Sequence, residues 1–526
     1  MVFISMGKII LAQQYFMPYE ATTYAAFEKK LYQPGSRFFT DIKPYLAKEV
    51  FNTYGDTTQS LFSIYGDYFS AVPFSKRGWY RKLRTEHLFD VTGEEYHIQI
   101  DPILHQESGA ERIAGEGLRV NTRGVMVRGT LGKNLGFFSS YLENQASFVN
   151  YLDSFILQNR VVPGQGMIRI FKGANYDYAS ATGYIQYQPA KFLNLQFGHE
   201  RNFIGDGYRS LLLSDNTYPY PFLKMITTVG PFRYMNLYGF MMDMRSPVIR
   251  DQGFQKKFVN IHYLSSHIGK RVTFSLFESI TWGGNNRFLD PAYLNPVIFY
   301  HPIAFSDQSS ANILLGANLK VIPIKNIVVY SQLMLDEFRG KDIATRNGWW
   351  GNKQGVQGGI KYFDVAGIKN LFLQTEFNYV RPYTYQYANT LTNYEHYNQP
   401  LAHPVGANFI ESLSWIRYRY KSVSGEFKWQ YLIYGDDLYG VNNGRRVYNN
   451  YLSRPRDFDI KTTDGLLNVI TALQLTGRYH LNPRTGLVLE SSLLVRNHLI
   501  QDIAQPRTVM ITFGLRTLLF NRYYDF

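Results

Sequence analysis

The stretch from Gly198 to Lys224 combines charged and amide side chains with an apolar run, and it holds the best candidates for a chemical site. Once buried, its two arginines must pair, most simply with Asp206 and Asp215, or they must bind an anionic ligand. Arginine and asparagine side chains could then fix hydroxyl or carboxylate groups of such a ligand. Leu211–Leu213 would be costly to leave in water, so we expect the loop to fold back and be buried. It is then either a structural plug or a ligand-contacting loop. The candidate ligand-binding residues are Arg201, Asn202, Phe203, Asp206, Arg209 and Asn216.

Hydrolytic chemistry is disfavoured in this stretch. His199, Asp206 and Ser214 are close in sequence, but no G-x-S-x-G elbow surrounds the serine. Paired carboxylates elsewhere could act as in glycosidases, although luminal charges of a barrel usually form ion pairs. The chain has no cysteine, and the acidic turn at 434–444 lacks the spacing of a calcium loop. We therefore predict no catalytic residue, no metal site and no cofactor.

A second loop, 283–307, has a similar character. Asp290 can cap a helix that begins with Pro291, and Arg287 lies just before it as a further candidate for ligand binding. The helix-like run that follows contains apolar residues that water would not favour, namely Leu294, Val297, Ile298 and Phe299. We expect this loop, too, to fold into the lumen, as an occluding plug or as part of a binding site.

Alternating strands must position both loops. In 425–434, one face carries Phe427, Trp429, Tyr431 and Ile433, and the other carries Glu426, Lys428 and Gln430. The segments 370–379 and 508–516 repeat the pattern, with Phe377 and Phe513 on the apolar face. Apolar faces recur on too many strands for one compact core, so a lipid-facing surface is the better interpretation.

The spacing of turns predicts the number of strands. Eight short turns, from 131–134 to 481–483, alternate with nine long loops, from 106–117 to 498–506, and together they join eighteen strands. Outer-membrane barrels have even strand numbers, short periplasmic turns and long extracellular loops. The predicted fold is all-β, a single transmembrane antiparallel β-barrel of about 18 strands.

Composition agrees with this prediction. Aromatic residues make up 16% of the 526 residues, and the mean hydropathy is −0.24. No apolar run is long enough for a transmembrane helix. The net charge of +14 is scattered along the chain, which favours anionic lipid or an acidic polysaccharide as partner and gives no reason to expect nucleic acid.

The two ends of the chain differ from the middle. Residues 1–12 resemble the end of a secretory signal peptide. Residues 13–93 alternate poorly, and we expect a periplasmic or plug segment with short helices there, followed by the barrel over 94–526. The final strand is expected to run to Phe526, and a terminal Phe resembles the signal that hands barrels to the outer-membrane insertion machinery.

The loop described first also carries a resemblance. Its pattern G-x-x-R-N-F-x-G-x-G-x-x-S-L-L-L-S-x-N-x-x-P-x-P resembles the signature of the Wzi-type capsule-assembly outer-membrane proteins. It looks closer still to their RemB-like relatives, which are linked to gliding motility in Bacteroidota. The matching residues are Phe203, Gly205, Gly207, Ser210, Leu211, Leu213, Ser214, Asn216, Pro219 and Pro221.

The resemblance implies a non-enzymatic protein in the outer membrane of a Gram-negative bacterium. Its role would be attachment or assembly of surface polysaccharide, or gliding, with the lumen occluded by inward loops. Its partners would be outer-membrane lipid, an acidic surface polysaccharide and other surface or motility proteins. A porin or channel, and a scaffold for other surface proteins, are the alternatives, and an open lumen would favour the channel.

Overall fold

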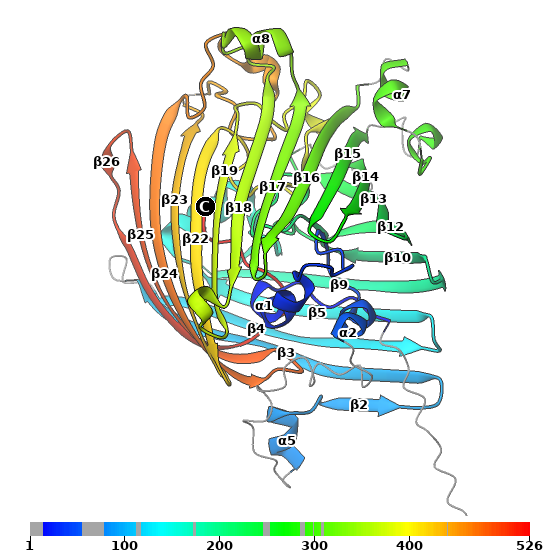
Figure 1. The fold of residues 1–526 in the computed structure, drawn as a ribbon. Helices are drawn as coiled ribbons and strands as arrows, with labels where there is room; N and C mark the ends of the chain where they lie inside the picture. The colour runs from blue at the N-terminus through cyan, green and yellow to red at the C-terminus, as the bar shows by residue number, and fades with distance from the viewer. Residues whose placement is uncertain are drawn as a thin grey trace, which may run out of the picture.

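A closed antiparallel barrel dominates the computed structural model of this chain (Figure 1). The structure describes residues 14–54, 78–111, 117–171, 175–245, 253–283, 290–297, 299–306, 310–438 and 440–526. The predicted signal peptide, 1–12, and Arg287 lie outside these ranges. No helix within them is long and apolar enough to cross a membrane.

Eighteen strands of the described residues form the barrel wall, as the turn spacing predicts. They are β3 (Tyr96–Glu111), β4 (Gly117–Leu131), β5 (Leu135–Ser147), β9 (Asn175–Ala190), β10 (Leu193–Glu200), β12 (Tyr220–Val229), β13 (Phe232–Asp243), β14 (Gln255–Ile268), β15 (Val272–Gly283), β16 (Asn312–Ile324), β17 (Ile327–Glu337), β18 (Lys353–Phe363), β19 (Leu371–Val380), β22 (Phe409–Tyr420), β23 (Val423–Asp436), β24 (Leu466–Asn482), β25 (Leu487–Ile500) and β27 (Thr508–Thr517). β27 pairs with β3 and closes the sheet.

The remaining short strands either extend the barrel sheet or form separate two-stranded sheets. β2 (Phe89–Thr92), β8 (Arg169–Phe171) and β26 (Ile503–Ala504) add to the barrel sheet. Separate pairs are formed by β1 (Ile42–Lys43) with β11 (Phe203–Ile204), β6 (Val161–Val162) with β7 (Gly166–Met167), and β20 (Glu395–His396) with β21 (Gln399–Pro400).

The helices are short, and those among the described residues lie inside or beside the barrel and form no part of its wall. They are α1 (Ala21–Leu31), α2 (Ala47–Tyr54), α5 (Gly78–Arg84), α6 (Asn150–Asn159), α7 (Tyr300–Ser306) and α8 (Gly340–Thr345), with 3₁₀ turns η1 (Pro291–Tyr293), η2 (Val365–Gly367), η3 (Thr390–Thr392) and η4 (Tyr451–Ser453). The end with short turns is the periplasmic end by the general rule for these barrels, and α1 and α2 lie in its mouth (Figure 1).

The predicted strand faces are confirmed. Phe377, Phe427 and Phe513 are exposed on the outer wall, where lipid would cover them. Their neighbours Glu376 and Thr512 are buried on the lumen side. Alternation alone therefore sets the register of these strands, because a slip by one residue would exchange the two faces.

The N-terminal segment fills the periplasmic mouth. α1 and α2 pack together in one apolar cluster that includes Phe27 and Val50. Asp41 accepts hydrogen bonds from the hydroxyls of Ser265 at 2.7 Å and Ser275 at 2.8 Å on the barrel wall. Ion pairs such as Arg233–Glu49, at 2.9 Å, hold the segment at its edge.

The C-terminus departs from the prediction. The last strand ends at Thr517, and the expected strand to Phe526 is wrong. Residues 518–526 turn into the lumen, where Phe526 packs against two interior apolar clusters, and the end of the chain lies among the strands in Figure 1. Charged partners inside the barrel bind Asp525, which explains why the alternation breaks there. Recognition by the insertion machinery stays a prediction.

The 283–307 loop also departs from the prediction. Asp290 caps η1 as expected, because its carboxylate accepts a hydrogen bond of 3.0 Å from the amide of Ala292. The loop does not enter the lumen, however. Val297 and Phe299 are exposed, and its polar contacts go to outward-facing residues of β13–β15 such as Asn236 and Glu278. Both lumen and bilayer hide apolar side chains, so the apolar run alone did not distinguish them.

Candidate functional site in the barrel lumen

The loop of residues 201–219 folds back into the lumen, as its leucines predict, and we call it the plug loop or plug. Leu211, Leu212 and Leu213 are fully buried in the main interior cluster. Their backbone is satisfied as well, because the hydroxyls of Tyr385 and Tyr394 each donate to a leucine carbonyl at 2.8 Å. Paired backbone groups and buried side chains together fix the loop in one conformation.

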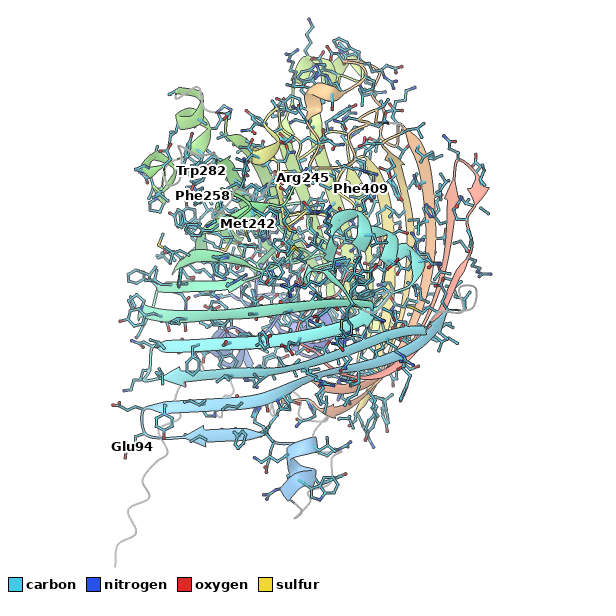
Figure 2. The ribbon with its side chains drawn as sticks, turned by 180° about the vertical axis from the view of Figure 1, so that it is seen from behind. Glu94, Met242, Arg245, Phe258, Trp282 and Phe409 are labelled. Atoms are coloured by element: carbon cyan, nitrogen blue, oxygen red, sulfur yellow. The ribbon has the colours of Figure 1, made fainter. Side chains whose placement is uncertain are left out.

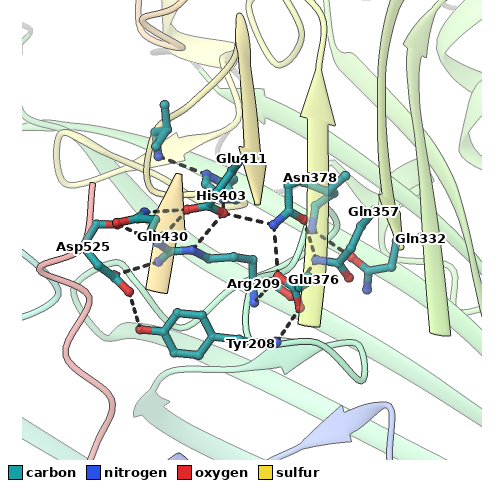
Figure 3. A network of polar contacts seen from close by, with 12 residues as sticks. Tyr208, Arg209, Gln332, Gln357, Glu376, Asn378, His403, Glu411, Gln430 and Asp525 are labelled. Atoms are coloured by element: carbon teal, nitrogen blue, oxygen red, sulfur yellow. Dashed lines mark hydrogen bonds and ion pairs between the residues drawn. The ribbon is translucent and has the colours of Figure 1, made fainter. Parts of the chain in front are cut away.

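Arg209 lies at the centre of a buried polar network (Figure 3). Its side chain is 0% exposed and forms ion pairs of 3.1 Å with Glu411 on β22 and 3.1 Å with Asp525 in the C-terminal tail. It also donates to the carbonyl of Asp525 at 2.6 Å. Burial opposes the charged form, but Asp525 and Glu411 outweigh it and raise the pKa of Arg209 well above its ordinary value.

Two carboxylates of the barrel wall, Glu376 and Glu411, accept further hydrogen bonds in this network (Figure 3). Glu376 on β19 accepts from the amide of Tyr208 at 2.8 Å and from the hydroxyl of Tyr330 at 2.8 Å. Glu411 contacts the ring of His403 at 2.8 Å and the amide of Gln430 at 2.7 Å. The network therefore ties the loop, the barrel wall and the tail into one unit.

Asp206 does not pair with the loop arginines, and that expectation is wrong. It accepts hydrogen bonds from Tyr32 at 2.8 Å and Thr40 at 2.6 Å, both in the N-terminal segment. Burial raises the pKa of Asp206, but the charges of Lys320 and Lys43 outweigh it and hold the pKa below its usual value. The loop therefore contacts the N-terminal segment through Asp206 and the C-terminal tail through Arg209.

Asp215 contacts the tail as well and pairs with neither arginine. It accepts from Asn521 at 2.9 Å and from the hydroxyl of Tyr523 at 2.7 Å. Arg201 instead donates to backbone carbonyls, that of Thr217 at 3.0 Å and that of Gly164. The sequence did not predict these contacts of Asp215 and Arg201, because the expected pairing considered only charges within the loop.

The other predicted site residues are also held by the chain itself. Asn202 accepts from Lys224 at 2.9 Å, and the amide of Asn216 donates to the carbonyl of Pro400 at 3.0 Å. Phe203 pairs with Lys43 across the short sheet of β1 and β11. The structure thus brings all six described candidates together in the plug, and a ligand-contacting role for them stays a prediction.

Two residues that complete the network were missed by sequence reasoning. Glu411 could have been found, because alternation along β22 places it on the lumen face beside Glu376 and its partners. Asp525 could not, because the tail was interpreted as the end of a strand. Both lie far from Arg209 in the sequence, by 202 and 316 residues.

A cavity of about 150 Å³ lies beside the plug. It runs along the lumen face of β22–β27 and is bounded by the tail, by the start of α1 and by α6. Arg417, Arg478 and Arg516 line it, but carboxylates pair with them, as in the 2.6 Å contact between Arg478 and Glu490. The cavity is therefore polar and nearly charge-balanced.

The long loops at the extracellular end build a second candidate surface. Trp350 and Tyr451 have ring centroids 4.7 Å apart, and the guanidinium of Arg454 lies 4.0 Å from the Trp350 ring centroid. Leu452 and Phe458 are exposed beside them. We call these five residues the extracellular aromatic patch. The loops that carry it are joined by backbone hydrogen bonds, including one of 2.9 Å from Trp350 to the carbonyl of Asp457.

Comparison with known proteins supports the fold. No protein-family model matches the chain, and no curated protein matches it in sequence. Among solved structures, the chain is similar to Wzi of Escherichia coli, described as an outer-membrane protein involved in group 1 capsule assembly and as a carbohydrate-binding β-barrel. The TM-score is 0.58 and the identity 12%, over 96% of this chain and 100% of Wzi.

Weaker similarity extends to other solved structures. OprD of Pseudomonas aeruginosa matches with a TM-score of 0.44 and 9% identity, over 82% of this chain and 95% of OprD. OccAB4 of Acinetobacter baumannii matches with a TM-score of 0.43 and 8% identity, over 80% of this chain and 97% of that one. The chain is an outer-membrane β-barrel of a Gram-negative bacterium with a Wzi-like fold.

Proposed function

We propose that this protein is a closed barrel that binds an acidic surface polysaccharide at its extracellular end and performs no catalysis. The extracellular aromatic patch carries the proposal. Sugar rings present flat C–H faces that stack on aromatic rings. The guanidinium of Arg454 lies beside Trp350 and pairs with Asp457, which is exposed, so a sugar carboxylate can exchange with this surface partner. The likeness to Wzi, a carbohydrate-binding barrel, supports the same class of ligand.

The filled lumen favours polysaccharide binding at the extracellular surface. The plug loop, the N-terminal segment and the C-terminal tail occupy the interior, so a long polymer has no path through it. The buried arginines of the plug are committed to partners within the chain, as Arg209 is to Glu411 and Asp525. A polysaccharide would therefore be held by the loops that face outward, with the plug as their support.

Polysaccharide binding is tested with the purified protein in detergent and labelled polysaccharide extracted from the parent cells. Trp350→Ala combined with Arg454→Ala should weaken binding at least several-fold without changing insertion. Arg346→Ala, which removes an exposed arginine of the loop that carries Trp350, is the matched control. Equal binding by the double variant and the control would refute a role for the patch.

The cellular role follows from deletion of the gene. Loss of surface polysaccharide supports attachment or assembly of a capsule, and loss of cell spreading with polysaccharide intact supports the gliding role of the RemB-like proteins. Cells that lose neither property would contradict both. Complementation with the double variant of the patch then links the phenotype to the proposed binding surface.

A channel is the second candidate, and the 150 Å³ cavity beside the plug is the observation that favours it. The arginines among its lining residues would attract small anions if the tail moved. The arginines there are already paired with carboxylates such as Glu490, which weakens this candidate. Conductance measurements separate it from the closed barrel.

A further inference from the structure

Four polar side chains interrupt the outward face of β13, β14 and β15. Their strand neighbours point into the lumen, since Leu237 joins the interior cluster and Tyr263 donates to Asp41 of the N-terminal segment at 2.8 Å. Alternation places every second residue on the opposite side of the wall. The outward polar residues are Asn236, Asn260, His262 and Glu278, and all are buried.

These residues lie at the depth of the lipid-facing band. Glu278 pairs with Leu315 on β16, and Asn236 pairs with Met225 on β12, two residues from Leu223. Leu315 and Leu223 are both exposed on the outer wall. Polar groups at this depth need partners within the protein, because hydrocarbon supplies none.

The partners come from residues 290–297 and 299–306, which we call the external strap. Asn260 donates to the carbonyl of Tyr293 at 2.6 Å. The carbonyl of Pro296 accepts from Asn236 at 2.9 Å and from the hydroxyl of Tyr234 at 2.7 Å. Side chains of the wall thus satisfy carbonyls of an irregular segment that could not otherwise lie in a bilayer.

The beginning of α7 is docked in the same way. The amides of Tyr300 and His301 donate to a carboxylate oxygen of Glu278 at 3.0 Å and 3.2 Å. The hydroxyl of Tyr300 lies 2.6 Å from the ring nitrogen Nε2 of His262. A carboxylate at the amino end of a helix is electrostatically favourable, which explains an acidic residue on this outer face.

Apolar contacts fasten the inner side of the strap. Phe258 and Trp282 stack with centroids 5.3 Å apart on the outer wall, and Figure 2 shows them beside the segment that carries α7. Tyr293 and Tyr300 of the strap join the same buried cluster. The strap is therefore a fixed part of the wall, held by both polar and apolar contacts.

The outer side of the strap exposes large apolar side chains beside polar ones such as Asn295 and His301. The side chains of Val297 and Phe299 are 78% and 72% exposed, although the strap lies against a wall that faces lipid. We propose that the external strap lies within the outer leaflet, where Val297 and Phe299 contact the acyl chains of the lipids. The protein then meets its membrane on this side through an extracellular loop that descends along the barrel, and not through strands alone.

Nitroxide labels on single cysteines test this proposal, since the chain has no native cysteine. Val297→Cys and Phe299→Cys are labelled in the full-length protein and reconstituted into liposomes, and collision rates with oxygen and with a water-soluble nickel chelate are measured. Phe197→Cys, exposed on the outer wall, is the lipid reference, and Lys461→Cys, in an extracellular loop, is the water reference.

Lipid contact predicts an oxygen-to-nickel collision ratio at 297 and 299 that matches the Phe197 reference and exceeds the Lys461 reference several-fold. A ratio like that of Lys461 would place the strap in water and overturn the proposal. Low collision rates with both reagents in native outer-membrane vesicles, but not in liposomes, would identify a protein partner as the occupant and overturn it as well. Retained heat-modifiable migration confirms that each labelled variant is folded.

Discussion

The guanidinium of Arg209 lies 3.1 Å from a carboxylate oxygen of Asp525, which is the second-last residue of the chain. This ion pair joins the plug loop to the C-terminal tail inside the barrel. With Glu411 on the wall it forms a triad in which Arg209 and Glu411 are fully buried and the Asp525 side chain is 8% exposed, so the plug, tail and wall are expected to loosen together when one member is lost.

Arg209→Ala should destabilise the protein by about 3–5 kcal/mol, because removing one member of a buried ion pair leaves uncompensated carboxylates. The midpoint of urea unfolding in detergent measures this effect. Arg346→Ala, an exposed arginine, should leave the midpoint unchanged. A stable Arg209→Ala protein that has lost polysaccharide binding would instead assign this loop to the ligand.

The pH dependence of stability should report on Asp525. Burial raises its pKa, but Arg209 and Lys428 outweigh burial and hold the pKa below the ordinary value of 3.8. A lowered folded-state pKa contributes stability above the unfolded value, and this contribution is lost as the pH falls through the folded value.

Wild type should therefore lose stability below about pH 4, as Asp525 takes up a proton. Asp525→Asn should be less stable at neutral pH and should show a smaller loss on acidification. Unfolding midpoints measured between neutral pH and pH 3 compare the two proteins. Parallel curves would show that the charge of Asp525 does not hold the tail.

Neighbouring residues of the last strand should respond oppositely to charge. Phe513 is 62% exposed on the outer wall, so Phe513→Arg should cost about 2–4 kcal/mol if it lies near the bilayer midplane and should impair insertion. Thr512 borders the luminal cavity, and Thr512→Arg should be tolerated. Heat-modifiable migration after expression measures insertion. Greater damage from Thr512→Arg would mean that the register of β27 is wrong by one residue.

The barrel could be predicted from the sequence because its strands and turns are recognised from residues close together in the chain. A lipid-facing Phe427 beside a luminal Lys428 repeats on strand after strand, and turn spacing then counts the strands. The burial of the 201–219 loop could also be predicted from neighbouring residues, because three consecutive leucines, Leu211–Leu213, would be costly to expose to water.

The contacts that close the lumen are not local. Arg209 meets Glu411 and Asp525 across most of the chain, and only folding brings these charges together. The external strap was misplaced because its apolar run fits a lumen and a bilayer equally. The distinguishing signal was the set of outward polar residues, such as Asn236 and Glu278, on strands that should face lipid.

The conductance of the purified protein in planar bilayers tests the closed barrel most directly. The plug, the N-terminal segment and the tail should keep the wild-type barrel closed, so the account predicts no steady open-pore current at moderate voltage. Rare flickering in Arg209→Ala would agree with a plug held by this ion pair. A steady current through the wild-type protein, comparable to that of a general porin, would contradict the account.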